Sequence, residues 1–166
     1  MDQTHVHLLI THLPIFGSIL GAFVLAYGLW SKSNQTKIAA YYVLIISAIA
    51  AGISYLTGEA AEETAENLQG VSETIIEQHE EFALFALIGL AIVGLFALVG
   101  LYLTMVNSAL IKKVATITLI LSLISFGLMA RTGYLGGQIR HSEIRSGVNQ
   151  PIDNATENKE RSVDDD

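Results

Sequence analysis

Four long apolar stretches, separated by polar segments, dominate the hydrophobic pattern of the chain. They cover residues 8–30, 38–57, 82–106 and 114–136. Each is close to the roughly 20 residues that a helix needs to cross the hydrocarbon of a bilayer, and none shows the alternation of a strand. A helix satisfies its own backbone hydrogen bonds, as a lipid environment demands. The pattern therefore predicts an all-α protein, a bundle of four transmembrane helices.

The polar segment between the second and third stretches is acidic and helical in pattern. Residues 58–81 hold eight glutamates and no lysine or arginine. We expect the second helix to continue beyond the membrane until Gly70 ends it. Ser72 is then expected to cap a third helix that starts near residue 73. Helices two and three would project beyond the lipid as a hairpin.

Lysines mark the opposite ends of the same stretches. Residues 31–37 and 107–113 each carry two lysines and no acid. By the positive-inside rule these loops face the cytoplasm, so both termini face the outer, periplasmic side of a bacterial cytoplasmic (inner) membrane. Residues 1–147 form the transmembrane domain, and residues 148–166 are polar enough to predict a disordered acidic tail.

Composition narrows the possible functions. Hydrophobic residues make up 51% of the 166 residues and charged residues only 15%, which gives a mean hydropathy of +0.48. The chain has no cysteine, which excludes thiolate metal sites and covalently attached c-type haem. The net charge of −7 leaves no basic face for a nucleic acid, so nucleic acid is not an expected partner.

Small residues recur at four-residue spacing within the apolar stretches. Gly17 with Gly21, and Ala48 with Gly52, are two such pairs. This spacing is typical of helices whose backbones approach each other closely in lipid. We therefore expect both pairs to lie at helix–helix contacts.

The five histidines all lie near the predicted outer ends of the apolar stretches. His5, His7 and His12 open the first stretch, His79 precedes the third by about one turn, and His141 follows the fourth. His12 is the deepest of them, and an imidazole in hydrocarbon must find a partner. His5 lies where the terminus is expected to fray. We expect the other four to form one layer at one membrane face.

Charged side chains near this layer widen the candidate site. Glu62, Glu63 and Glu80 are candidate metal ligands or hydrogen-bond acceptors for ligating imidazoles; the alternative is a solvated acidic face. The Glu-x-x-His signature of ferritin-type diiron proteins is absent from the segment before His79, which argues against such a site. Arg131 can snorkel outward, or it can pair with a glutamate or with a propionate of a bound cofactor.

These residues leave three functions open. Imidazoles from facing helices can hold haem b without any cysteine, with His12 and His79 as the preferred axial pair and His7 and His141 as a second pair or supporting groups. A non-haem zinc, copper or iron site would use three or four of these histidines with the glutamates. A structural subunit would bind no cofactor. The first two predict an electron-transfer or metal-binding protein rather than a stand-alone enzyme.

Several of these residues carry a family resemblance. His7-Leu-Leu-Ile-Thr-His12-Leu-Pro14 resembles the His-Pro-x-x-x-His-Phe-Pro opening of a bacterial family of predicted four-helix membrane proteins, known mostly as a domain of unknown function. His79-Glu80 is similar to the entry of its third helix. Gly136-Gly-Gln-Ile-Arg-His141 is similar to its closing Gly-Gly-x-Leu-x-x-x-His pattern, with a shorter spacing before the histidine.

The resemblance extends over residues 5–146, with two departures in the opening motif. Leu8 stands where the family has proline, and Leu13 where it has phenylalanine; neither changes a candidate ligand. The resemblance favours His7, His12, His79 and His141 over His5 as site residues. Relatives joined to Rieske or c-type cytochrome domains imply redox chemistry. They also imply redox partners, such as cytochrome c or Rieske proteins, besides the lipid bilayer.

Overall fold

The computed structural model describes residues 3–66 and 72–140, and all regular structure in these residues is helical. The helices are α1 (Gln3–Ile10), α2 (His12–Trp30), α3 (Asn34–Leu56), α4 (Gly58–Glu66), α5 (Glu73–Met105) and α6 (Ile111–Arg140). Four segments are long and apolar enough to cross a membrane, namely Thr4–Trp30, Asn34–Leu56, Glu73–Met105 and Ile111–Ile139. Each overlaps one predicted stretch, so the all-α fold with four spans is confirmed. The predicted tail lies outside the described residues.

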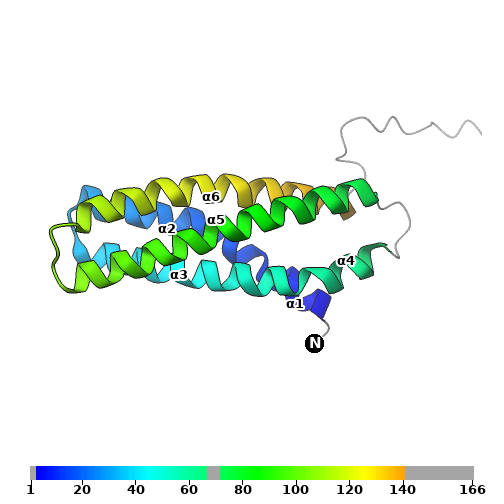
Figure 1. Ribbon diagram of the computed structural model, residues 1–166, viewed down its shortest axis with the longest axis horizontal. Coiled ribbons are helices and arrows are strands. Elements are labelled where there is room, and N and C mark those ends of the chain that lie inside the picture. The colour runs from blue at the N-terminus through cyan, green and yellow to red at the C-terminus, as the bar shows by residue number, and fades with distance from the viewer. Residues whose placement is uncertain (1–2, 67–71, 141–166) are drawn as a thin grey trace, which may run out of the picture.

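Helices α2, α3, α5 and α6 form a bundle in which each helix packs along two neighbours. α5 lies between α6 and α3, and α2 closes the bundle against α3 and α6. The short helices α1 and α4 lie together against α3 at one end of the bundle, and the turns that join α2 to α3 and α5 to α6 lie at the other (Figure 1). We call the first the histidine end, after His7 and His79, and the second the lysine end, after Lys32, Lys112 and Lys113.

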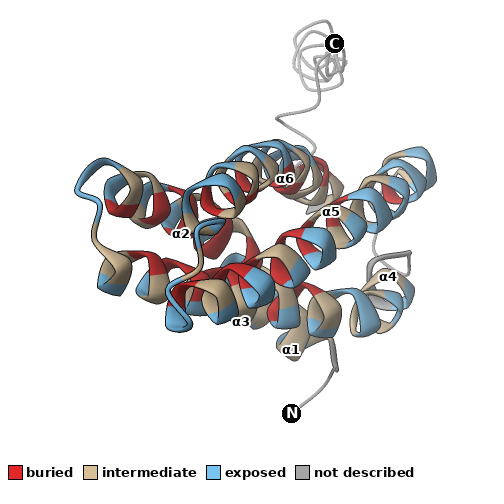
Figure 2. Ribbon diagram, turned by 60° about the vertical axis from the view of Figure 1, so that its left-hand side comes forward, coloured by how far each residue is buried: buried red, intermediate tan, exposed pale blue. Residues whose placement is uncertain are grey.

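Large apolar side chains cover much of the outer surface of the bundle. Buried residues form a stripe on the inward side of each of the four long helices, and exposed residues cover the outward side (Figure 2). The outward side includes large side chains that are mostly exposed, such as Leu9 (70%), Phe23 (64%) and Leu95 (60%). Soluble proteins rarely expose so large an apolar surface to water. This surface therefore faces lipid.

Small residues let the helices approach each other at particular points. A Cβ atom on Gly17 would collide with the side chain of Ser47, and one on Gly21 would lie 2.5 Å from Leu44. The expectation for Gly52 is wrong, because nothing lies within 4 Å of the Cβ position there; its predicted companion Ala48 instead packs against Gly94 of α5. Four-residue spacing alone does not reveal which face of an apolar helix meets a neighbour.

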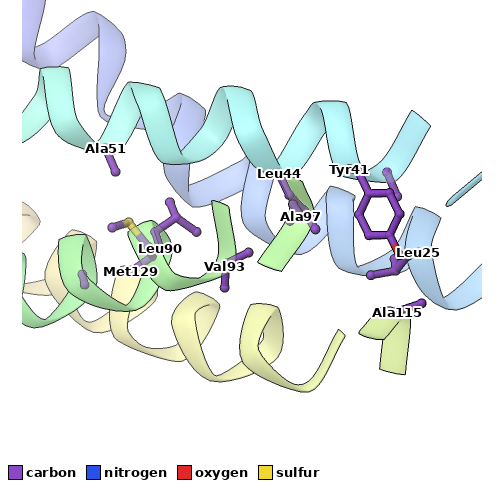
Figure 3. Packing of buried hydrophobic residues seen from close by; sticks show 11 residues of the cluster. Leu25, Tyr41, Leu44, Ala51, Leu90, Val93, Ala97, Ala115 and Met129 are labelled. Atoms are coloured by element: carbon purple, nitrogen blue, oxygen red, sulfur yellow. The ribbon is translucent and has the colours of Figure 1, made fainter. Parts of the chain in front are cut away.

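The core runs along the axis of the bundle. Leu90 lies beside Met129 near Ala51 at one end of the buried cluster, and Tyr41 of α3 lies beside Leu25 of α2 at the other (Figure 3). At the lysine end, the ring of Tyr41 lies so close to α5 that a Cβ on Gly100 would come within 2.5 Å of it. This contact fixes the spacing of α3 and α5.

Two buried serine hydroxyls of the core are satisfied within their own helices. Ser47 donates to the Val43 carbonyl at 2.7 Å, and Ser122 donates to the Thr118 carbonyl at 2.8 Å. Such bonds to the preceding turn are the usual solution for serine and threonine in apolar helices. These hydroxyls therefore mark close packing, and the candidate site lies elsewhere.

Two breaks redirect the chain at the histidine end. Thr11 separates α1 from α2, and Thr57 separates α3 from α4. The second helix therefore extends beyond its span as predicted, but only after a break. α5 begins at residue 73 as expected, although the side chain of Ser72 makes no capping hydrogen bond. Gly70, the predicted end of the extension, lies outside the described residues.

Candidate functional site

The imidazole of His7 lies against the junction of α3 and α4. Its Nδ1 atom is 2.8 Å from the carbonyl oxygen of Ser54. The last four carbonyls of a helix lack intrahelical donors, and Ser54 belongs to the last turn of α3. The ring also faces Gly58, whose Cβ position is 3.6 Å from His7 Cε1. The break at Thr57 thus provides both the acceptor and the space for this imidazole.

The imidazole of His79 lies against α6 in a similar way. Its Nδ1 atom is 3.0 Å from the carbonyl oxygen of Thr132. That carbonyl lies inside a continuous helix, where a side chain at residue 136 would ordinarily obstruct it. Residue 136 is glycine, and a Cβ there would lie 3.1 Å from His79 Cε1. The missing side chain lets the ring reach the helix backbone.

The two histidines share one arrangement, which we call an imidazole seat. In each seat the ring bonds a carbonyl four residues before a glycine and lies against that glycine: Ser54 and Gly58 for His7, Thr132 and Gly136 for His79. The seats belong to different parts of the bundle, since α1 packs on α3 and α4 whereas α5 packs on α6. Two elements distant in sequence therefore present imidazoles in the same way.

The hydrogen bonds determine the protonation of both rings. A carbonyl oxygen can only accept, so Nδ1 carries the proton in each neutral imidazole and Nε2 keeps its lone pair. Both rings are partly buried. The histidine end therefore holds two imidazoles, each fixed through Nδ1 and each able to bind a metal through Nε2.

Comparison with known proteins agrees with this architecture. A family model described as a predicted membrane protein, DUF2231, matches residues 3–145. The chain belongs to the DUF2231 family. No curated protein and no solved structure that was compared with the chain matches it. Membership in DUF2231 covers both seats and establishes a membrane protein without naming a cofactor.

His12 occupies a different environment in this DUF2231 protein. Its Nδ1 atom bonds the Leu8 carbonyl of its own helical turn at 3.1 Å, and its ring stacks with Phe16. Thr11 donates to the same carbonyl at 3.2 Å. Both side chains therefore compensate for the break between α1 and α2. His12 is exposed, whereas His7 and His79 are partly buried.

The charged candidates are exposed or partly buried side chains. Arg131 is exposed, with its guanidinium 5.5 Å from the ring centre of Phe82 and 5.6 Å from that of Tyr134. Glu63 on α4 and Glu80 on α5 are exposed, and Glu62 is partly buried. Within residues 3–66 and 72–140, no three His, Asp or Glu side chains converge in a group that could hold a metal ion. His141 lies outside the described residues.

Sequence reasoning missed the residues that build the seats. The backbone carbonyls that accept from the rings belong to Ser54 and Thr132, and the glycines that leave room for the rings are Gly58 and Gly136. The sequence predicted only the histidines themselves. The available signal was a glycine at the outer end of the second stretch and another at the outer end of the fourth. A glycine opposite a histidine allows close approach to backbone, but the pairing of residues 79 and 132 requires the fold.

Proposed function

We propose that this DUF2231 protein is an electron-transfer membrane protein that binds haem b at the histidine end, where His7 and His79 would hold the haem. The observation that carries the proposal is the pair of matched imidazole seats presented by α1 and α5, which both pack against α3. Histidines that ligate metals almost always donate their other ring N–H to a carbonyl or carboxylate, which fixes the ring and raises its basicity. Both seats have this feature.

The number of protein ligands favours haem over a non-haem ion. The porphyrin supplies four nitrogen ligands to its iron, so two imidazoles complete the coordination. A zinc, copper or iron site made of protein alone needs three or four side chains, and the described residues offer no such group. Bound haem would supply one-electron exchange, while His7 and His79 would bind and orient it.

Arg131 is the candidate to meet a haem propionate. It lies one residue from Thr132, the acceptor for His79, and its guanidinium rests on aromatic rings at the surface. An arginine held in this way can pair with a carboxylate while it stays near water. The exposed acids Glu63 and Glu80 give the same end a negative surface, which suits a basic redox partner such as a cytochrome c.

The proposal places the histidine end on the periplasmic side of a bacterial inner membrane. The distribution of charge supports this orientation, because glutamates lie at this end and acid-free lysine loops lie at the other, and lysine-rich loops face the cytoplasm. Because the chain has no cysteine, single cysteines introduced by Glu63→Cys and Lys113→Cys can be labelled separately in cells. A maleimide that does not cross the membrane should label position 63 and leave position 113 unlabelled. The reverse pattern would refute the orientation.

The visible spectrum of the purified full-length protein in detergent tests the haem proposal. We expect a Soret band and a pyridine haemochrome typical of haem b. His7→Ala and His79→Ala should each abolish it, because one remaining axial imidazole binds haem far more weakly. His12→Ala is the matched control, since this imidazole bonds its own helix, and it should retain the band.

The other outcomes each favour a different function. A Soret band that survives in both His7→Ala and His79→Ala would place haem elsewhere and refute the ligand assignment. A colourless protein that retains stoichiometric metal, lost in the same two variants, would support a non-haem site completed by residues beyond these two. A protein that binds neither after expression with excess haem and iron would be a structural subunit.

A further inference from the structure

The lysine end carries a feature that the haem proposal does not use. A shallow open groove runs along the first two turns of α6 and is lined by Ala109, Lys112, Lys113, Thr116 and Ile117. Its lining residues recur at spacings of three and four, which places them on one outward face of the helix. Both lysines are exposed.

The groove combines positive charge with apolar surface. Lys112 and Lys113 give the groove its positive charge. Residues 107–111, which precede them, contain no acid. Ala109 and Ile117 provide apolar walls. Next to it lie the exposed apolar side chains of Leu110 (52%) and Ile120 (54%), which face lipid. A molecule that fits this groove must therefore carry both an anionic group and a hydrocarbon chain.

We propose that this groove binds the headgroup phosphate of an anionic phospholipid, with its acyl chains along the apolar face of α6. The groove lies at the end of a transmembrane span, at the level where headgroups meet hydrocarbon. Basic pockets beside transmembrane helices attract anionic headgroups, and each lysine near such a surface contributes about 1 kcal/mol. Charge complementarity thus selects the occupant.

The remaining lysines of this end supply the controls. Lys32 is exposed but does not line the groove. Lys37 is buried at 6% exposure, and its Nζ donates to Asn34 Oδ1 at 3.1 Å, so it serves the start of α3. Lys32→Gln therefore removes one lysine charge from the same end without touching the groove.

Thermal unfolding of the full-length protein in detergent, with added lipid, tests the proposal. Phosphatidylglycerol should raise the unfolding midpoint of the wild type and of Lys32→Gln, whereas phosphatidylcholine should not. Lys112→Gln/Lys113→Gln should weaken the apparent lipid affinity about fivefold for each lysine removed, the factor that about 1 kcal/mol represents. Ala109→Leu keeps both charges and fills the groove, and should also weaken the response.

Three results would overturn the proposal. Equal stabilisation by the two lipids would show that charge does not select the occupant. An unchanged response in the double-lysine variant and in Ala109→Leu would place the lipid elsewhere. Inorganic phosphate that reproduces the effect of phosphatidylglycerol would show a site for free anions instead of a lipid. None of these outcomes depends on haem, so the two proposals stand or fall separately.

Discussion

The two imidazole seats use the same chemistry but differ in how firmly the fold holds them. His79 projects from a 33-residue helix against a 30-residue helix, and α5 and α6 pack along one another in the bundle. His7 projects from α1, which has eight residues and is separated from α2 by the break at Thr11. One imidazole therefore belongs to the bundle, and the other to a short arm laid against it.

The glycines show the same difference. The Cβ position of Gly136 lies 3.1 Å from the ring of His79, while that of Gly58 lies 3.6 Å from the ring of His7. The first distance is tighter than ordinary contact and the second is ordinary van der Waals contact. His79 consequently requires a glycine opposite it, whereas His7 could accept a small side chain. The seat of His79 therefore depends on the absence of a side chain at residue 136, and the seat of His7 depends on the position of α1.

The largest expected difference comes from placing alanine at each glycine. Gly136→Ala should displace the His79 ring and cost its hydrogen bond, which is worth about 0.5–1.5 kcal/mol. We expect haem affinity to fall by about tenfold at the upper end of that range. Gly58→Ala should change it by less than about twofold. Titration of the haem-free protein with haem, followed by absorbance, measures both.

A matched response would contradict this comparison. Alanine is the better helix former in a helix interior, where Gly136 lies, whereas Gly58 is the first residue of α4, so a general gain in helix stability is expected only for Gly136→Ala. Circular dichroism at increasing temperature shows whether both variants remain folded. If Gly58→Ala weakens binding as much as Gly136→Ala does, the two seats are equally tight and the distinction drawn from the Cβ distances fails.

The membrane spans were predictable because they depend only on length and hydrophobicity. Each stretch is apolar over enough residues to cross a bilayer, and the structure places a helix over each of them. The start of α5 at Glu73 was predictable for a similar local reason, because a serine followed by an acidic residue is typical of a helix start, although the Ser72 side chain makes no capping hydrogen bond. Such features need no knowledge of neighbouring elements.

The faces of these helices were not predictable, and this explains the ranking of His12. A helix that is apolar all round has no periodic signal to show which side points inward. The sequence ranked His12 first because it lies deepest, yet the structure places it on the exposed side of α2. The contact between His79 and Thr132 joins residues that are 53 apart in the sequence. It depends on the packing of α5 against α6, which no local pattern shows.

A smaller effect should follow from straightening the arm that carries His7. Proline has no N–H and its ring clashes with the carbonyl four residues earlier, so Pro14 leaves the Ile10 carbonyl without its helical donor and favours the break at Thr11. Pro14→Ala restores that donor and favours continuation of α2 into α1. The His7 ring should then shift from Ser54, while His79 keeps its bond to Thr132.

We expect Pro14→Ala to weaken haem binding roughly threefold, because a hydrogen bond that is strained rather than lost costs the lower part of the usual range. The effect should appear on the His7 side alone. Gly136→Ala acts on the other seat, so the double variant should lose affinity by the product of the two single losses. A Pro14→Ala protein that binds haem as tightly as the wild type would show that contacts with α3 and α4, rather than the break, hold α1 in place.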